Sequence, residues 1–65
     1  MNKEIFEVMT GDVCLARSFT HHQAMEIAEK YANDYTNTNG VAPFRVVNGF
    51  EFPDGMLITV ETKKI

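Results

Sequence analysis

Two adjacent histidines and one cysteine are the side chains of this sequence best suited to bind a metal or to attack a substrate. His21 and His22 stand where a helix is expected to begin, and neighbouring helical residues diverge by about 100° around the axis. The two rings therefore cannot chelate one ion as an i, i+4 pair does, and no other ligand lies at a metal-site spacing. We expect His21 to pack at the margin of the core and His22 to be solvated, and we predict no metal site.

Cys14 lies in the middle of an extended segment, two residues after a predicted turn. A cysteine nucleophile needs a helix N-terminus or a basic neighbour, and only the distant histidines offer one. As the single cysteine of the chain, it cannot form an internal disulfide. The sequence also lacks a Gly-rich phosphate loop, a pair of catalytic carboxylates and a Ser-His-Asp set. We therefore predict a protein with no catalytic residues and no cofactor.

Length and charge narrow the class of protein further. The chain has 65 residues, of which 45% are hydrophobic, and a net charge of -3, so we expect a single folded domain over residues 1–65. A domain of this size buries only about 60% of its unfolded surface, which makes a second chain an expected source of stability. The acidic balance disfavours nucleic acid and anionic membranes as partners. Residues 1–4 lack the apolar core of a signal peptide, which favours a cytoplasmic location.

The N-terminal third of the chain predicts a β-hairpin. Two apolar runs, residues 5–10 and 13–19, flank Gly11-Asp12, which fits a tight two-residue turn. This turn sets Met9 opposite Cys14, Val8 opposite Leu15 and Phe6 opposite Arg17. Alternation then assigns to the core face Phe6, Val8, Val13, Leu15 and Phe19. The opposite face receives Ile5, Glu7, Met9, Cys14, Ala16 and Ser18.

A helix is expected next. Thr20 and Gln23 fit a capping box, and Phe19 is placed to pack on Ala24 as a hydrophobic staple. One continuous arc of this helix is apolar or aromatic and includes His21, Ala24, Met25, Ile27, Ala28, Tyr31, Ala32 and Tyr35. The Asn- and Thr-rich run that ends at Gly40 predicts the end of the helix and a polar loop over residues 36–43.

A second hairpin is predicted from residues 44–52 and 56–63 around the turn Pro53-Asp54-Gly55. Asn48-Gly49 fits either a β-bulge inside the first strand or a tight turn of its own, and we favour the bulge. Alternation places on the core face Phe44, Val46, Phe50, Phe52, Met56, Ile58 and Val60. The other face receives Arg45, Val47, Glu51, Leu57, Thr59, Glu61 and Lys63.

These elements predict a two-layer α+β fold in the order ββαββ, with one helix packed on a mostly antiparallel sheet. The strand order does not follow from the sequence. The helix covers one sheet face, and the other face carries the residues that we expect to form an interface: Ile5, Met9, Cys14, Arg45, Val47, Glu51 and Leu57. All five phenylalanines point toward the helix in these registers, which disfavours an RNA reader that stacks bases on its sheet.

The function that this pattern favours is a small non-catalytic protein-interaction module. It would bind another protein through the open sheet face, a strand edge or the loop over residues 36–43, and we expect a homodimer. In architecture alone the layout resembles many tiny phage or mobile-element proteins that bind and block a host enzyme, which implies a viral regulator or inhibitor. The alternative is a nucleic-acid-associated regulator, either antitoxin-like or an RNA-binding module.

Overall fold

The N-terminal hairpin forms as predicted at its turn. In the computed structural model, which describes residues 3–64, β1 (Glu4–Thr10) and β2 (Val13–Ser18) are antiparallel. Gly11, at φ 57°, supplies the left-handed backbone of the turn, and Met9 pairs with Cys14. Beyond this pair the register changes, because Val8 pairs with Ala16. Leu15 is therefore the extra residue of a β-bulge, which the sequence analysis did not predict.

The bulge reverses the predicted faces for the rest of β2, because a one-residue shift moves every later side chain to the other side. Ala16 packs against the core instead of facing away from the helix. Arg17, predicted opposite Phe6, pairs with Glu7 instead. Phe19, predicted in the core, is 83% exposed, so the staple onto Ala24 was also a wrong prediction.

Helix α1 (His21–Asn39) begins where the capping signal predicted. The Thr20 hydroxyl accepts a hydrogen bond from the Gln23 backbone amide at 3.1 Å, which is the hydroxyl half of the capping box. The buried stripe of the helix consists of Ala24, Ala28 and Ala32. Small side chains along this stripe allow the helix to approach the sheet closely.

The helix ends later than the polar run predicted. Thr36 and Asn39 are helical, and their side chains donate to the carbonyl oxygens of Ala32 and Tyr35, four residues back, at 2.9 and 3.0 Å. Gly40, at φ 74°, ends the helix in the left-handed conformation, and its amide donates to the Thr36 carbonyl. The link to the next strand is therefore limited to residues 40–43 and not the predicted 36–43.

The segment predicted as one bulged strand, residues 44–52, folds instead into a hairpin of its own. Strands β3 (Phe44–Val46) and β4 (Gly49–Glu51) flank a two-residue turn in which Asn48 has φ 60°. The favoured bulge was wrong. A separate turn forms, but its two central residues are Val47 and Asn48, and Gly49 is the first residue of β4 and pairs with Val46. Strand β5 (Leu57–Lys64) follows the turn at residues 53–55, so the sheet has five strands and not four.

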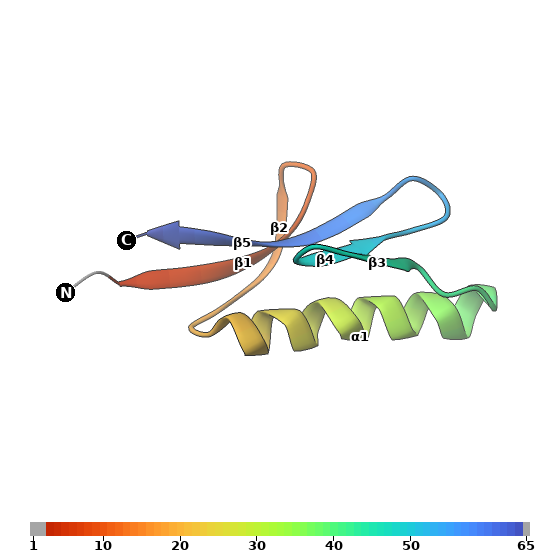
Figure 1. The fold of residues 1–65 in the computed structure, drawn as a ribbon, viewed down its shortest axis with the longest axis horizontal. Coiled ribbons are helices and arrows are strands. Elements are labelled where there is room, and N and C mark those ends of the chain that lie inside the picture. Colours follow the sequence, from red (N-terminus) through yellow and green to blue (C-terminus); the bar gives the residue numbers. More distant parts are fainter. Residues whose placement is uncertain (1–2, 65) are drawn as a thin grey trace.

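The complete fold is α+β, as predicted, with one helix against one face of an open antiparallel sheet. The strand order is β2-β1-β5-β4-β3, and the long strands β1 and β5 pair along their length at the centre. In Figure 1 the helix lies below the sheet, and the β1–β2 turn points away from it.

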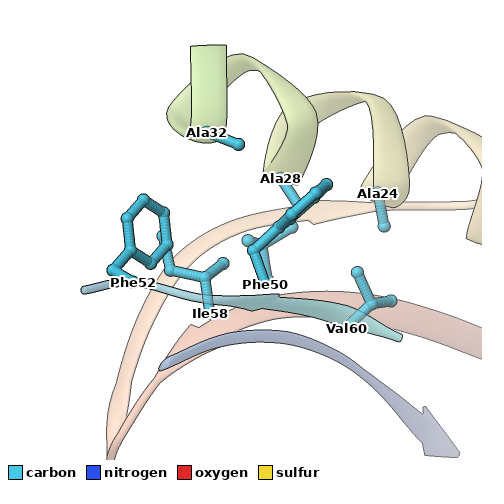
Figure 2. Close-up of a cluster of buried hydrophobic side chains, with 8 residues drawn as sticks. Ala24, Ala28, Ala32, Phe50, Phe52, Ile58 and Val60 are labelled. Carbon is cyan, nitrogen blue, oxygen red and sulfur yellow. The ribbon is translucent and has the colours of Figure 1, made fainter. Parts of the chain in front are cut away.

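The core lies between the alanine stripe of α1 and the facing side of the sheet (Figure 2). Val8 and Ile58 are its largest fully buried side chains, and the ring of Phe52 meets that of Tyr35 edge to face at 4.9 Å. The buried residues are Val8, Ala24, Ala28, Ala32, Phe50, Phe52, Ile58 and Val60.

Three further side chains predicted for the core are exposed. Val13 is 59% exposed because it adjoins the hairpin turn that points away from the helix (Figure 1). Met56, beside the turn at residues 53–55, is 38% exposed. Phe44 is 69% exposed because the unexpected turn pairs it with Glu51, and cross-strand partners share one face of a sheet.

Candidate functional site

The sheet surface that faces away from α1, here called the open face, is the main uncovered surface of the protein. Ile58 and Val60 are buried under the helix, so the alternating residues Leu57 and Thr59 point to the other side. Cross-strand partners share a face, which extends this assignment from β5 across the other four strands. The open face carries Ile5, Glu7, Met9, Cys14, Arg17, Phe44, Val46, Glu51, Leu57, Thr59, Glu61 and Lys63.

The apolar part of the open face lies over β3, β4, the start of β5 and the end of the β1–β2 hairpin nearest its turn. Phe44, Glu51 and Leu57 form one cross-strand row, in which Phe44 is 69% and Leu57 45% exposed. The next row brings Met9 and Cys14 together across β1 and β2. Large apolar side chains on neighbouring rows form a patch that no element of the described chain covers.

The charged part of the open face lies over β1, β2 and the end of β5. Arg17 Nε donates to Glu7 Oε2 at 2.9 Å, a pair that exists because the bulge at Leu15 turned Arg17 to this side. The hydrogen bond from Arg17 lowers the pKa of Glu7, against a smaller opposing effect of burial. The same bond raises the pKa of Arg17.

The Glu7 carboxyl gives a prediction for the dependence of stability on pH. Because its pKa in the folded protein is lowered, the Arg17 contact stabilises the fold above the unfolded-state pKa of Glu7, and this stabilisation disappears as the pH falls through the folded-state value. We expect Arg17→Gln to move the Glu7 pKa up, toward its ordinary value, in an NMR titration of the side-chain carboxyl. An unchanged titration in Arg17→Gln contradicts the assigned cause.

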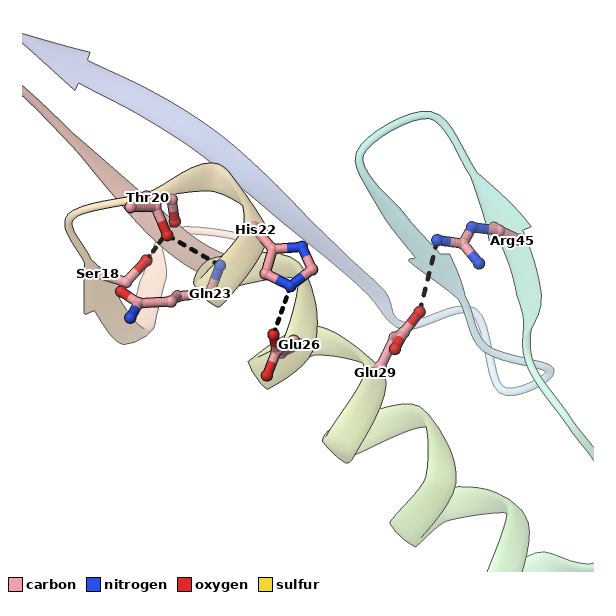
Figure 3. A network of polar contacts seen from close by, with 7 residues as sticks. All are labelled: Ser18, Thr20, His22, Gln23, Glu26, Glu29 and Arg45. Carbon is pink, nitrogen blue, oxygen red and sulfur yellow. Dashed lines mark hydrogen bonds and ion pairs between the residues drawn. The ribbon is translucent and has the colours of Figure 1, made fainter.

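Five of the seven predicted interface residues lie on the open face: Ile5, Met9, Cys14, Glu51 and Leu57. Arg45, predicted there, points to the helix side because it pairs with Phe50. Its Nη2 lies 3.5 Å from Glu29 Oε1 (Figure 3), and its Cζ lies 5.7 Å from the centre of the Phe50 ring. Val47 belongs to the β3–β4 turn and is 87% exposed.

The sequence analysis missed Phe44, Val46 and Arg17 on the open face; it assigned Phe44 and Val46 to the core face. The signal for Phe44 was the Asn48-Gly49 dipeptide, since a turn there moves Phe44 to the side of Glu51. No residue of β2 signals its bulge, because Leu15 is as apolar as its neighbours. Each error comes from a different unrecognised irregularity, the bulge in β2 for Arg17 and the turn between β3 and β4 for Phe44.

The two histidines contact different residues, and both are exposed. His22 Nε2 lies 2.7 Å from Glu26 Oε1 (Figure 3). The His21 ring meets Phe6 edge to face at 5.7 Å, and its Nε2 lies 3.3 Å from Asn48 Oδ1. Among residues 3–64, no three His, Cys, Asp or Glu side chains come close enough together to hold a metal ion.

Comparisons with known proteins leave the function to be argued from the chain itself. No family model matches the sequence, and no curated protein or solved structure shows significant similarity to it. The helix within the described residues is not apolar enough to cross a membrane.

Proposed function

We propose that this chain is a small non-catalytic interaction module that binds another protein through its open face. The observation that carries the proposal is the row Phe44–Glu51–Leu57, in which two large apolar side chains flank a carboxylate in an exposed position. Aromatic and aliphatic anchors surrounded by polar groups are typical of protein-binding surfaces. The pair Glu7–Arg17 and the side chains of Glu61 and Lys63 supply the polar rim.

Two other surfaces that the sequence allowed are less suitable. The edge strand β3 has only three residues, and the edge strand β2 carries a bulge and Arg17, features that oppose long edge-to-edge pairing. The predicted contact loop has shrunk to residues 40–43, because its first half is helical. The open face is therefore the surface that we assign to the partner.

The thin core supports a role in which a second chain adds stability. Of the eight buried residues in the described chain, three are alanines, and only Val8 and Ile58 are large and fully buried. A homodimer through the open face is the simplest such assembly, and a regulator or inhibitor of a larger protein is the role that the size fits. The exposed thiol of Cys14 suits a reducing compartment such as the cytoplasm.

A nucleic-acid-associated regulator is the second candidate. Phe44 and Phe19 are exposed, contrary to the sequence prediction, and exposed aromatic rings can stack on unpaired bases. Against this role, Arg17 and Arg45 each lie beside a carboxylate, which offsets the charge that would attract phosphate. The interaction module remains our first proposal for this reason.

Leu57→Asp is the sharpest test of the open face. We expect this change to weaken partner binding and homodimer formation by about 30-fold, because it replaces one of the two apolar anchors of the row with a second carboxylate beside Glu51. Val41→Asp is the matched control, since Val41 is 53% exposed in the 40–43 link and lies outside the open face. Analytical ultracentrifugation measures self-association, and affinity capture from the source cell followed by titration of the purified partner measures binding.

The outcomes separate the two candidates. If Leu57→Asp and wild type bind the same partner equally and sediment alike, the open face is not the binding surface. If purified protein instead retains RNA or DNA at low salt and Phe44→Ala abolishes that retention, the second candidate replaces the first.

A further inference from the structure

Two Asn-Gly dipeptides, at residues 39–40 and 48–49, are the points of the chain most open to spontaneous chemical change. The backbone nitrogen of a glycine can attack the side-chain amide carbon of the asparagine before it, since glycine has no Cβ to hinder the approach. This step expels ammonia and closes a cyclic imide, which water then opens to aspartate or isoaspartate. Both dipeptides have the same chemistry, so the fold decides which of them reacts.

Ring closure needs a glycine amide that is free of its hydrogen bond and a peptide group that can rotate toward the asparagine side chain. At the first dipeptide, the Gly40 amide donates to the Thr36 carbonyl at 2.8 Å. The Asn39 side-chain amide donates to the Tyr35 carbonyl at 3.0 Å. The reaction therefore proceeds from a locally opened state, and its rate follows the population of that state.

The last turn of α1 can open without disturbing the core. Residues 37–40 are all exposed, and Tyr35 is the last helical residue that packs against the core cluster. Thr and Asn have low helix propensity, and no basic side chain in the last turn offsets the negative end of the helix dipole. Opening at Asn39 thus breaks hydrogen bonds at an exposed helix end and uncovers no buried apolar surface.

The second dipeptide is held inside the sheet. The Asn48 carbonyl accepts from the Val60 amide at 2.7 Å, and Gly49 is buried and pairs with Val46. Rotation of the Asn48–Gly49 peptide breaks these contacts and separates β3 from β4. Because β4 contributes the buried ring of Phe50, this opening exposes the core. Its free energy is therefore close to that of global unfolding.

We propose that Asn39 is a site of spontaneous deamidation in the folded protein and that the sheet protects Asn48. In the opened last turn, the Gly40 nitrogen forms a bond to Asn39 Cγ, and the bond from Cγ to Nδ2 breaks. The proton of the Gly40 amide leaves with ammonia. Water then adds to either carbonyl of the imide, which gives aspartate or isoaspartate at position 39.

The modified residue should unwind the last turn of α1. Aspartate removes the donor to the Tyr35 carbonyl and places a negative charge at the negative end of the helix dipole. Isoaspartate routes the main chain through the side-chain carbon, which displaces Gly40 from Thr36. The net charge changes from -3 to -4, because one neutral amide becomes one carboxylate. Asn39 lies on the helix and not on the open face, so this inference is independent of the proposed function.

The test follows both sites in one sample of the full chain. The folded protein is incubated in mildly alkaline buffer, and a parallel sample is incubated in denaturing guanidinium chloride. Trypsin cleaves after Arg45, which places Asn39 and Asn48 in different peptides, and tandem mass spectrometry locates the asparagine that has become an acid. We expect Asn39 to react at least about 30-fold faster than Asn48 in the folded protein. In guanidinium chloride the two sites should react at similar rates.

Two substitutions at position 39 complete the test. Asn39→Gln should remove the fast reaction and leave the slow one at Asn48 unchanged, because the longer side chain closes its ring far less readily. Asn39→Asp should reproduce the modified state, with NMR shifts of backbone amides confined to residues 35–43. Equal rates at Asn39 and Asn48 in the folded protein would overturn the proposal. So would an intact Asn39 in the folded protein when both sites react in guanidinium chloride.

Discussion

Replacing Gly49 with alanine should remove a large part of the folding stability, and should unfold the protein if the wild type lies at the low end of the range for its length. An added Cβ at Gly49 would overlap the carbonyl oxygen of Ile58 and lie 2.8 Å from Thr59 Cα. Both obstacles are backbone atoms of the neighbouring strand β5, so no side chain can rotate to make room. We expect a loss of about 3 kcal/mol or more in the free energy of unfolding. Chains of this length have a total of about 3 to 10 kcal/mol.

Gly40→Ala is the matched control for this prediction. Gly40 has φ 74° and nothing within 4 Å of an added Cβ, so alanine there meets conformational strain without a collision. We expect a loss of about 1 kcal/mol. Urea denaturation followed by circular dichroism measures both variants. Equal losses for Gly40→Ala and Gly49→Ala would show that the close approach of β4 and β5 does not limit position 49.

The same glycine explains why part of the fold could not be predicted from the sequence. Asn48-Gly49 fits both a bulge and a tight turn in local terms, because both need an unusual backbone at this dipeptide. The choice is made by contacts distant in the sequence: Val60 donates to the Asn48 carbonyl at 2.7 Å, and Gly49 pairs with Thr59. A pattern read along one strand contains no information on such pairing.

Caps and turns in other parts of the chain could be predicted, because each depends on only a few neighbouring residues. The cap at Thr20, the left-handed glycine at Gly40 and the turn at Gly11 are present where the sequence placed them, although the helix itself continues to Asn39. The faces of β5 are also as predicted, since its alternation starts at a correctly placed turn and contains no irregularity. The predicted sheet faces were wrong for the residues of β2 after Leu15 and for the residues of β3 before Asn48. In β2 an extra residue shifted the alternation, and in β3 a turn did so.

The predicted interface residues were correct where the strand register was predicted correctly and wrong where it was not. Met9, Cys14 and Leu57 lie on the open face because their registers are set by the two correctly predicted turns. Phe44, Arg45 and Val46 each lie on the face opposite to the predicted one, because all three precede the unexpected turn. This reversal moved an aromatic side chain onto the open face and a charge off it, which strengthens the apolar character of that surface.

Phe52→Ala and Phe44→Ala should have opposite consequences, although alternation assigned both residues to one core face. Phe52 is 2% exposed and packs edge to face on Tyr35, so its truncation removes buried contacts and leaves a cavity. We expect Phe52→Ala to lower the free energy of unfolding by about 3 to 5 kcal/mol. Phe44 is 69% exposed, and Phe44→Ala should change stability by no more than about 0.5 kcal/mol.

Partner binding should show the reverse order. Phe44→Ala removes the aromatic anchor of the open face from a stable protein, so its binding to the partner captured by wild type should fall by about 30-fold. Phe52→Ala should bind in proportion to the fraction that remains folded, because its side chain lies on the helix side of the sheet. Thermal denaturation and titration of the same samples separate the two effects. A Phe44→Ala protein as unstable as Phe52→Ala would contradict the pairing of Phe44 with Glu51 and with it the assignment of the open face.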